Sequence, residues 1–442
     1  MENKILAGTA RADITPPLGY LLEGHGVRNK PSEKVHDPLN LKVLSLSKGK
    51  NRAVLVSCDL LCFMGDFIDA ARKEIREKTG LSARQVLICA SHTHTGPFML
   101  KLLGDNPENF VPEYFSVLIG KIAGAVGEAV RAEEPVSVRY GRRDIDMGIV
   151  NRRRKNPGGS IGGPDPHGPV DYEVSVLSFE RERGDPLALV FNYGCHPTTL
   201  AGNIFQVSAD YPGAAQGEIE NFYPGTTALF TNGCFGDVRP NLLDEKGKNF
   251  RGGDFNDLRR MGRLLASGTI QARETAVGLP VEKIESRLEE FPFPLDKNFL
   301  FKDEETLEKK FPSLVYQFRK TYEPLEGEIR WKDFWKEKLR RKETVPEFIK
   351  RDLHVIKIGE VAVVGIPGEA VAEIGLKIKK RLKKAFTAGV SNGYLSYIPS
   401  AAVLKEGGYE ASLFFYQEYP GPFAPSMEKR LLDRIFTMVE KE

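Results

Sequence analysis

Gln85-Val86-Leu87-Ile88-Cys89-Ala90-Ser91-His92-Thr93-His94-Thr95-Gly96-Pro97 is the stretch of sequence that decides the fold. Its apolar run predicts a buried strand, and Gly96-Pro97 predicts that the strand has ended. Because side chains alternate along a strand, we expect His92 and His94 to point the same way. Two imidazoles that converge where a strand ends suit a divalent metal or a proton-transfer site. The structural alternative is a pair of hydrogen-bonded surface histidines.

Strand-like and helix-like runs alternate on both sides of this segment. Strands are expected over 53–58, 86–90, 187–191, 227–231 and 361–364, and helices over 67–78, 112–131, 211–221, 256–274 and 369–384. This alternation predicts an α/β fold with mixed sheet layers flanked by helices. Ligands collect at the carboxyl ends of strands in such sheets, so we expect the active site there.

Two segments interrupt the alternation. The Gly- and Pro-rich stretch 156–170 predicts a long loop, of the kind that often forms a lid. The segment from about 300 to 350 is dense in Lys, Glu and aromatic residues, including Trp331 and Trp335. It predicts a helical insertion with a local aromatic core.

Composition excludes several classes of protein. The chain has 442 residues, and its 63 basic and 60 acidic side chains give a net charge of +3. This balance argues against nucleic acid as a partner. No apolar run is long enough for a transmembrane segment, and no signal peptide is recognisable at the start. The sequence leaves the oligomeric state open.

The five cysteines predict a reducing compartment. They form no CxxC pair and lie in or beside apolar segments, at Cys58, Cys62, Cys89, Cys195 and Cys234. We expect buried, reduced thiols and therefore a cytoplasmic protein. A cysteine hydrolase that uses Cys195 or Cys234 is a weaker alternative, because Cys195 and His196 would face opposite sides of a strand.

Other strand ends carry further candidates for chemistry. His196 follows an apolar strand and precedes Pro197, as His92 and His94 follow theirs. Glu369 follows the strand over 361–364, either as an oxygen ligand or general base, or as a carboxylate at a helix N-terminus. Tyr397 lies in Asn392-Gly393-Tyr394-Leu395-Ser396-Tyr397, where pattern alone predicts packing.

Taken in order, these motifs resemble the neutral/alkaline ceramidase family of zinc-dependent amidases. The matching segments run from Gly8-Thr9-Ala10-Arg11-Ala12-Asp13-Ile14-Thr15, through the block at 91–97, to Asn392–Tyr397. The resemblance covers the catalytic domain of the family, which is nearly all of this chain. It implies a single catalytic domain over 1–442 with a helical insertion at about 300–350, and without the C-terminal β-sandwich domain of the family.

The resemblance also implies a role for each site residue. It implies that His92, His196, Glu369 and Tyr397 bind Zn²⁺ and that His94 lies beside the metal, where it polarises the substrate carbonyl. Tyr397 would help His94 to stabilise the oxyanion. Asn151 and Arg152 match an Asn-Arg pair in the substrate region of the family. A carboxylate should orient a ligand imidazole, with Asp59, Asp210 and Asp237 as candidates.

One position departs from the family pattern. Arg239 lies in Gly236-Asp237-Val238-Arg239-Pro240-Asn241, where the family has a serine implicated in catalysis. A guanidinium there predicts an anionic group on the substrate, unless Arg239 pairs with Asp237 or another nearby acidic residue. We therefore do not expect ceramide itself to be the substrate.

The sequence thus predicts a zinc-dependent hydrolase. A zinc-bound water would attack the amide bond of a small N-acyl compound. Two alternatives stay open: an esterase or deacetylase acting on a sugar or lipid derivative, and a metal-binding homologue without catalysis.

Overall fold

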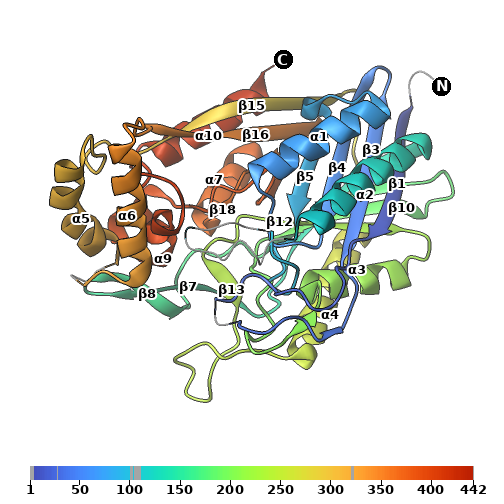
Figure 1. Cartoon of the computed structure of the whole chain (residues 1–442). Coiled ribbons are helices and arrows are strands. Elements are labelled where there is room, and N and C mark those ends of the chain that lie inside the picture. Colours follow the sequence, from blue (N-terminus) through green and yellow to red (C-terminus); the bar gives the residue numbers. More distant parts are fainter. Residues whose placement is uncertain (1–3, 27, 100–102, 104–110, 320–322, 442) are drawn as a thin grey trace.

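Two large β-sheets pack face to face, and helices cover their outer faces (Figure 1). The computed structural model describes residues 4–26, 28–99, 103, 111–319 and 323–441. The predicted α/β fold, with mixed sheet layers flanked by helices, is confirmed.

The first sheet contains most of the strands in the N-terminal part of the chain. Its order is β12 (Thr227–Asn232), β10 (Pro186–Tyr193), β9 (Glu173–Glu180), β6 (Glu134–Asp144), β1 (Ile5–Asp13), β3 (Asn40–Lys48), β4 (Asn51–Cys58) and β5 (Val86–Ala90), and β14 (Val277–Gly278) pairs with β6. The pairs β10–β12 and β4–β5 are parallel, whereas the other pairs are antiparallel. The sheet is therefore mixed.

The second sheet is built from later strands. Its order is β15 (Ile284–Pro294), β16 (Phe348–Ile358), β17 (Val361–Gly365) and β19 (Ala385–Ala388), and β17–β19 is the parallel pair. Three small sheets complete the strands: β13 (Val238–Pro240) with β7 (Ile149–Asn156) and β8 (Gly159–Asp165), β11 (Gln206–Val207) with β2 (Lys34–Val35), and β18 (Glu369–Ala370) with β20 (Tyr397–Ile398).

Helices cover both outer faces. α1 (Gly65–Thr79) and α2 (Pro112–Arg131) pack on one half of the first sheet, and α3 (Asp210–Phe222) and α4 (Phe255–Glu274) pack on the other half. α7 (Ala372–Leu382) and α10 (Met427–Glu440) cover the second sheet. The remaining helices are α5 (Glu304–Arg319), α6 (Glu326–Arg340), α8 (Ala401–Glu406) and α9 (Tyr409–Ser412), with short 3₁₀ turns at η1 (Ala83–Gln85) and η3 (Leu413–Tyr416).

Strands at the centre of this arrangement are buried on both faces. In β4, Val54 and Val56 pack toward α1 and α2, whereas Ala53 and Leu55 pack toward the second sheet. A strand that is covered on both sides has no polar face, so it is a continuous apolar run in the sequence. This burial explains why the apolar runs predicted these strands.

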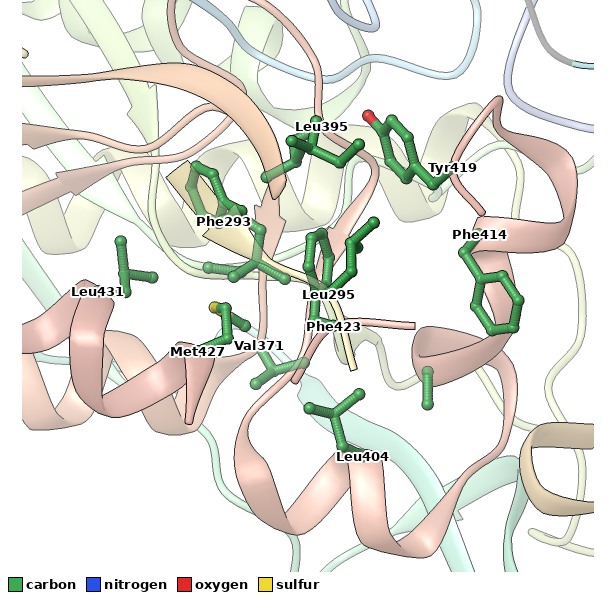
Figure 2. Close-up of a cluster of buried hydrophobic side chains, with 14 of the residues drawn as sticks. Phe293, Leu295, Val371, Leu395, Leu404, Phe414, Tyr419, Phe423, Met427 and Leu431 are labelled. Carbon is green, nitrogen blue, oxygen red and sulfur yellow. The ribbon is translucent and has the colours of Figure 1, made fainter. Parts of the chain in front are cut away.

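The predicted helical insertion is only partly correct. Helices α5 and α6 lie within the segment from about 300 to 350, but Phe348 already begins β16. The aromatic core of these helices is also not local, because Trp331 packs on Phe414 and Phe415 with ring centroids 5.9 and 5.2 Å away. These rings join one large buried cluster, part of which is drawn in Figure 2. The single-domain organisation stays a prediction.

The segment 156–170 is not the long loop that its composition predicted. β7 and β8 form an antiparallel hairpin that turns at Pro157 and Gly158, and Arg154 pairs with Ile161. The backbone of β8 pairs with β7 and is held by those hydrogen bonds, whereas its Gly-rich composition gives no sign of a strand.

The helix predicted over 369–384 also starts later. Glu369 and Ala370 form β18, and α7 begins at Ala372. The Glu369 N–H donates to the carbonyl of Ser396 over 2.9 Å, which holds the backbone extended. Glu369 is thus not at a helix N-terminus, and the helix-dipole alternative does not apply.

Membrane-spanning helices are absent from the described part of the chain, where no helix has the length and apolar character required. Cytoplasmic location stays a prediction.

Candidate metal centre

Strand ends from both sheets meet at one place. His92 follows β5, and His196 follows β10, both in the first sheet; Glu369 follows β17 in the second. Main-chain hydrogen bonds join the sheets there, because the N–H of Gly389 donates to Asn232 over 2.9 Å. The carboxyl ends of strands therefore do collect the candidate residues, as predicted.

His92 and His94 converge, but not for the reason that the sequence suggested. β5 ends at Ala90, and His92 adopts a left-handed backbone conformation with φ of 71°. Strand alternation therefore does not apply to the pair. The two rings are nevertheless 4.9 Å apart between centroids. Strained, non-glycine backbone of this kind is typical of functional sites.

Backbone carbonyls fix the tautomer of all three histidines. Nδ1 lies 2.7 Å from the Leu61 carbonyl in His92, 2.9 Å from the Gly24 carbonyl in His94, and 3.0 Å from the Phe235 and Val238 carbonyls in His196. A carbonyl only accepts, so each Nδ1 carries a proton, and the lone pair of each ring in its neutral form lies on Nε2. These carbonyls occupy the place where we expected a carboxylate.

One nitrogen from each ring lies within 4.8 Å of the other two. The Nε2 atoms of His92 and His94 are buried and have no hydrogen-bond partner among the described residues. Burial, together with the positive charge of Arg152, lowers the pKa of His196 to about 4. Neutral imidazoles are the form that binds a metal ion. The residues therefore fit a metal.

Glu369 adds an oxygen donor to this cluster. Its Oε2 lies 2.9 Å from His196 Nε2 and 3.5 Å from His92 Nε2. Its Oε1 accepts a 2.6 Å hydrogen bond from the hydroxyl of Tyr394. Burial raises the pKa of Tyr394 well above its usual value, so this phenol stays protonated and acts as the hydrogen-bond donor. One carboxylate oxygen is thus anchored by Tyr394, while the other faces the imidazoles.

Tyr397 completes the cluster from the short strand β20. Its hydroxyl lies 3.3 Å from His196 Nε2 and accepts a 2.9 Å hydrogen bond from Nη2 of Arg152. Arg152 is held in turn by Glu410, over 2.9 Å, and by the carbonyl of Gly236, over 2.8 Å. The buried pair of Arg152 and Glu410 thus positions the phenol oxygen.

A cavity of about 440 Å³ opens onto this cluster. His92, His94, Glu369 and Tyr397 line it, together with apolar and aromatic side chains, among them Leu61, Phe98, Tyr409, Leu413 and Tyr416. His94 is the least buried of the three histidines and lies on the cavity side. The cavity has room for a substrate beside the metal-binding groups.

The predicted substrate residues do not line this cavity. The amide of Asn151 donates to Asp237 and to the Pro169 carbonyl, both over 2.9 Å. Arg152 donates a hydrogen bond to the hydroxyl of Tyr397, as described above. A substrate-binding role for Asn151 and Arg152 stays a prediction, with no contact to the cavity among the described lining residues.

Arg239 does not pair with Asp237. The Asp237 carboxylate accepts instead from the Ala372 N–H, over 2.8 Å, and from Asn151. The Arg239 guanidinium lies 4.3 Å from the centre of the Phe250 ring, and its buried Nε has no hydrogen-bond partner that the structure describes. Asp237 therefore supports the backbone, and Arg239 keeps its charge available.

The other carboxylates and cysteines are structural. Asp59 accepts from the Asn40 N–H, and Asp210 accepts from the Thr199 N–H, both over 3.0 Å. Cys195 is buried in the cluster between the first sheet and α3–α4, and burial raises its pKa well above the usual value. Burial likewise raises the pKa of Cys234 to about 12, so neither thiol is a ready nucleophile.

Sequence reasoning missed several residues around the cluster. Tyr394, which anchors Glu369, was predicted only to pack, and Glu410, His25 and Arg28 were not singled out. Tyr394 lies three residues before Tyr397, a spacing that hinted at a shared role. His25 and Arg28 come from an irregular segment and Glu410 from the four-residue helix α9, and neither is long enough or regular enough for a periodic pattern to mark a side chain.

Comparison with known proteins places this geometry in a family. Residues 5–257 match the family model for the N-terminal part of neutral/alkaline non-lysosomal ceramidases. The match covers more than half of the 442 residues, and the chain belongs to this family.

Curated relatives carry the same name. Neutral ceramidase A of Dictyostelium discoideum is 25% identical over 262 residues, which are 53% of this chain and 35% of that protein. Neutral ceramidase of Pseudomonas aeruginosa is 24% identical over 275 residues, which are 58% of this chain and 40% of that protein. The chain therefore matches well under half the length of these relatives.

The fold is shared as well. The crystal structure of neutral ceramidase from Pseudomonas aeruginosa has a TM-score of 0.73 and 17% identity, and the match covers 99% of this chain and 74% of that one. The resemblance to this family is thus confirmed. The expectation that ceramide is not the substrate finds no support, because the matched relatives are themselves named neutral ceramidases.

Proposed function

We propose that the chain is a zinc-dependent hydrolase that cleaves the amide bond of an N-acyl compound. The observation that carries the proposal is the approach of three ring nitrogens to within 4.8 Å of one another, beside the carboxylate of Glu369. The name of the family supports amide chemistry. Ceramide is accordingly the first substrate to test, followed by smaller N-acyl compounds.

We assign His92, His196, Glu369 and Tyr397 as the groups that hold zinc. Imidazole nitrogens and carboxylate or phenol oxygens are suitable donors for Zn²⁺. When bound, zinc would act as a Lewis acid and lower the pKa of a water to about 7. Arg152 and Glu410 act as positioning residues, because they hold the Tyr397 oxygen at the cluster.

We assign His94 to the substrate side as a proton acceptor. Its Nδ1 proton is donated to the Gly24 carbonyl, so Nε2 offers a lone pair toward the site. Gly24 permits this approach, because a Cβ there would lie 2.4 Å from the ring of His94. Polarising a carbonyl would instead require a proton on Nε2. The neutral tautomer therefore favours proton acceptance over the polarising role that the family resemblance implied.

Zinc content and hydrolysis test this proposal together. We expect one zinc per metal-loaded chain, loss of that zinc in His92→Ala and His196→Ala, and hydrolysis of ceramide or an N-acyl compound by wild type only. His167→Ala is the matched control, because His167 is exposed and lies outside the cluster. His94→Ala should retain zinc but lose kcat.

Each alternative has its own outcome. Zinc well below one per chain in metal-loaded wild type would overturn the metal assignment. A zinc-loaded protein that hydrolyses no amide but cleaves matched esters would be an esterase. Zinc binding without any hydrolysis would favour the non-catalytic homologue, and loss of zinc in His94→Ala would make His94 a ligand.

A further inference from the structure

Two half-buried arginines near the cavity, Arg28 and Arg239, have no carboxylate partner among the described residues. Arg28 lines the cavity, and Arg239 lies on β13 at the turn that follows β12. Among the described residues, no carboxylate oxygen lies within 4.0 Å of either group. A guanidinium removed from water without a counter-charge is costly, so such a pair needs an explanation.

Several other partly or fully buried arginines pair with a carboxylate. Arg152 and Arg153 share Glu410, Arg273 pairs with Glu180, and Arg319 pairs with Glu328. Arg154 and Arg351 are partly buried and form no ion pair with a described carboxylate, as is true of Arg28 and Arg239. Among the described arginines, Arg28 and Arg239 are the two whose pKa is lowered to about 10, first of all by burial.

Arg28 is fixed by backbone rather than by charge. Its Nη1 donates to the Glu23 carbonyl over 2.9 Å and to the carbonyl of His94. Its Nε and Nη2 are buried and have no partner within the described part of the chain. Asp210 is the carboxylate that acts on Arg28 from beyond ion-pair distance, and it accepts from the N–H groups of Thr199 and Tyr211. Two donors of Arg28 therefore stay available.

His25 connects Arg28 with Arg239. The His25 ring lines the cavity 5.3 Å from the His94 ring, and its buried Nε2 has no partner among the described residues. Burial, together with the charges of Arg28 and Arg239, lowers the pKa of His25 to about 4. A positive field thus reaches His25 from both guanidiniums, right beside His94.

We propose that the cavity binds its N-acyl substrate by a negatively charged group, which Arg28 holds next to His25 and the charge of Arg239 attracts. Guanidinium groups bind carboxylate, sulfonate and phosphate oxygens through charge-assisted hydrogen bonds. The apolar and tyrosine side chains of the cavity, such as Leu413 and Tyr416, would contact the acyl group. This inference rests on the proposed amide hydrolase function.

Three ligands with one acyl chain test the inference on the zinc-loaded protein. N-octanoylglycine carries a carboxylate, N-octanoyltaurine a sulfonate that binds zinc poorly, and N-octanoylethanolamine no charge. Preference is measured as the ratio of kcat/KM values where the amide is cleaved, and as the ratio of calorimetric Kd values where it is not. We expect both anionic ligands to be preferred by about tenfold, the range of one charge-assisted hydrogen bond.

Matched variants locate the source of the preference. Arg28→Gln and Arg239→Gln should each remove most of it, whereas Arg28→Lys should keep part. Arg183→Gln is the control, because the Arg183 side chain is 75% exposed and pairs only with Asp185 among the described residues. Arg239 makes no side-chain hydrogen bond with a described residue, so Arg239→Gln should fold even if Arg28→Gln does not.

The outcomes separate this inference from the function on which it rests. Equal use of the three ligands, or a preference that survives both glutamine variants, would overturn the anionic subsite. A preference for carboxylate alone that survives them would mean that the carboxylate binds zinc. If no amide is cleaved but anion binding depends on Arg28, the subsite stands and the hydrolase proposal fails.

Discussion

In the candidate metal centre, each histidine and Glu369 offers one polar atom to the site and forms a hydrogen bond elsewhere with its other polar atom. Each imidazole donates its Nδ1–H to a carbonyl, and one oxygen of Glu369 accepts a hydrogen bond from Tyr394. Such outer contacts fix the orientation of the donors before any metal arrives. At the scale of single residues, the site is therefore preorganised by hydrogen bonds that carry no sequence motif of their own.

Tyr394→Phe tests this preorganisation. Removing the hydroxyl leaves Oε1 of Glu369 buried without its 2.6 Å donor, so we expect zinc affinity to fall by about 10- to 100-fold. The measurement is competition for zinc with a chelator of known affinity. Activity at saturating zinc should recover, since Tyr394 is a positioning residue. Tyr172→Phe, at an exposed tyrosine, is the control, and equal zinc affinity in the two variants would refute the anchoring role.

Prediction at this scale was uneven. His92 and His94 could be found because they follow an apolar run, yet the argument from strand alternation was wrong at a residue with φ of 71°. Arg28 and His25 could not be found, because nothing in an irregular segment shows which cavity a side chain enters. The assignments of His92, His196, Glu369 and Tyr397 to zinc stay predictions.

Short elements bring the ligands of the two sheets together. β18 carries Glu369 and pairs in parallel with β20, which carries Tyr397. The turn at Gly236 packs directly on β18, since the Gly236 N–H donates to the Ala370 carbonyl over 2.8 Å. A two-residue strand of this kind is held by its neighbours rather than by its own propensity.

Gly236→Ala tests the fit between this turn and β18. A Cβ on Gly236 would lie 2.4 Å from the carbonyl oxygen of Glu369, so β18 must shift. We expect a loss of about 1–3 kcal/mol in the free energy of unfolding and weaker zinc binding. The measurements are urea unfolding and the chelator competition.

Gly217→Ala is the matched control for this substitution. Gly217 lies inside α3, where an added Cβ meets nothing within 4 Å. Alanine should therefore leave zinc affinity unchanged and stabilise the helix by about 0.5–1 kcal/mol. Equal zinc affinity in Gly236→Ala and Gly217→Ala would contradict the proposed contact.

Long helices could be predicted where one buried face gives a periodic pattern of apolar residues in the sequence. The helix expected over 112–131 has these bounds in the structure, because its apolar face is continuous against the first sheet. The strands β1, β3, β6, β9, β15 and β16 were not predicted, and neither were the hairpin β7–β8 and the strand β18. The backbone partners of β7–β8 and β18 are rich in glycine or distant in sequence, so no local periodicity marked these elements.

Across the whole molecule, the helices α5 and α6 support the wall of the cavity. Trp331 packs on Phe414 and Phe415 and donates a 2.7 Å hydrogen bond to the Tyr419 carbonyl. The neighbours of these phenylalanines, Leu413 and Tyr416, line the cavity. The segment predicted as an insertion thus contributes to the site through a shared core.

Trp331→Ala tests this coupling. Because Trp331 is fully buried, we expect a loss of about 3–5 kcal/mol in the free energy of unfolding, together with a raised KM. Urea unfolding followed by far-UV circular dichroism gives the first, and steady-state kinetics the second. Phe334→Ala on the same helix is the control, because Phe334 is only partly buried and should lose less. Unchanged stability and KM in Trp331→Ala would make α5 and α6 an independent insertion.

The sequence by itself determined the α/β class, several strands of the parallel pairs, several helices, and the family to which the chain belongs. Strands that are buried on both faces appear in the sequence as continuous apolar runs. The motifs at the ends of these strands follow one another in the order that is typical of the family. Only the tertiary structure decided which side chains meet. Glu369 reaches His196 from the other sheet, and Arg28 reaches the cavity from an irregular segment. Such contacts depend on how two sheets pack, which no local pattern encodes.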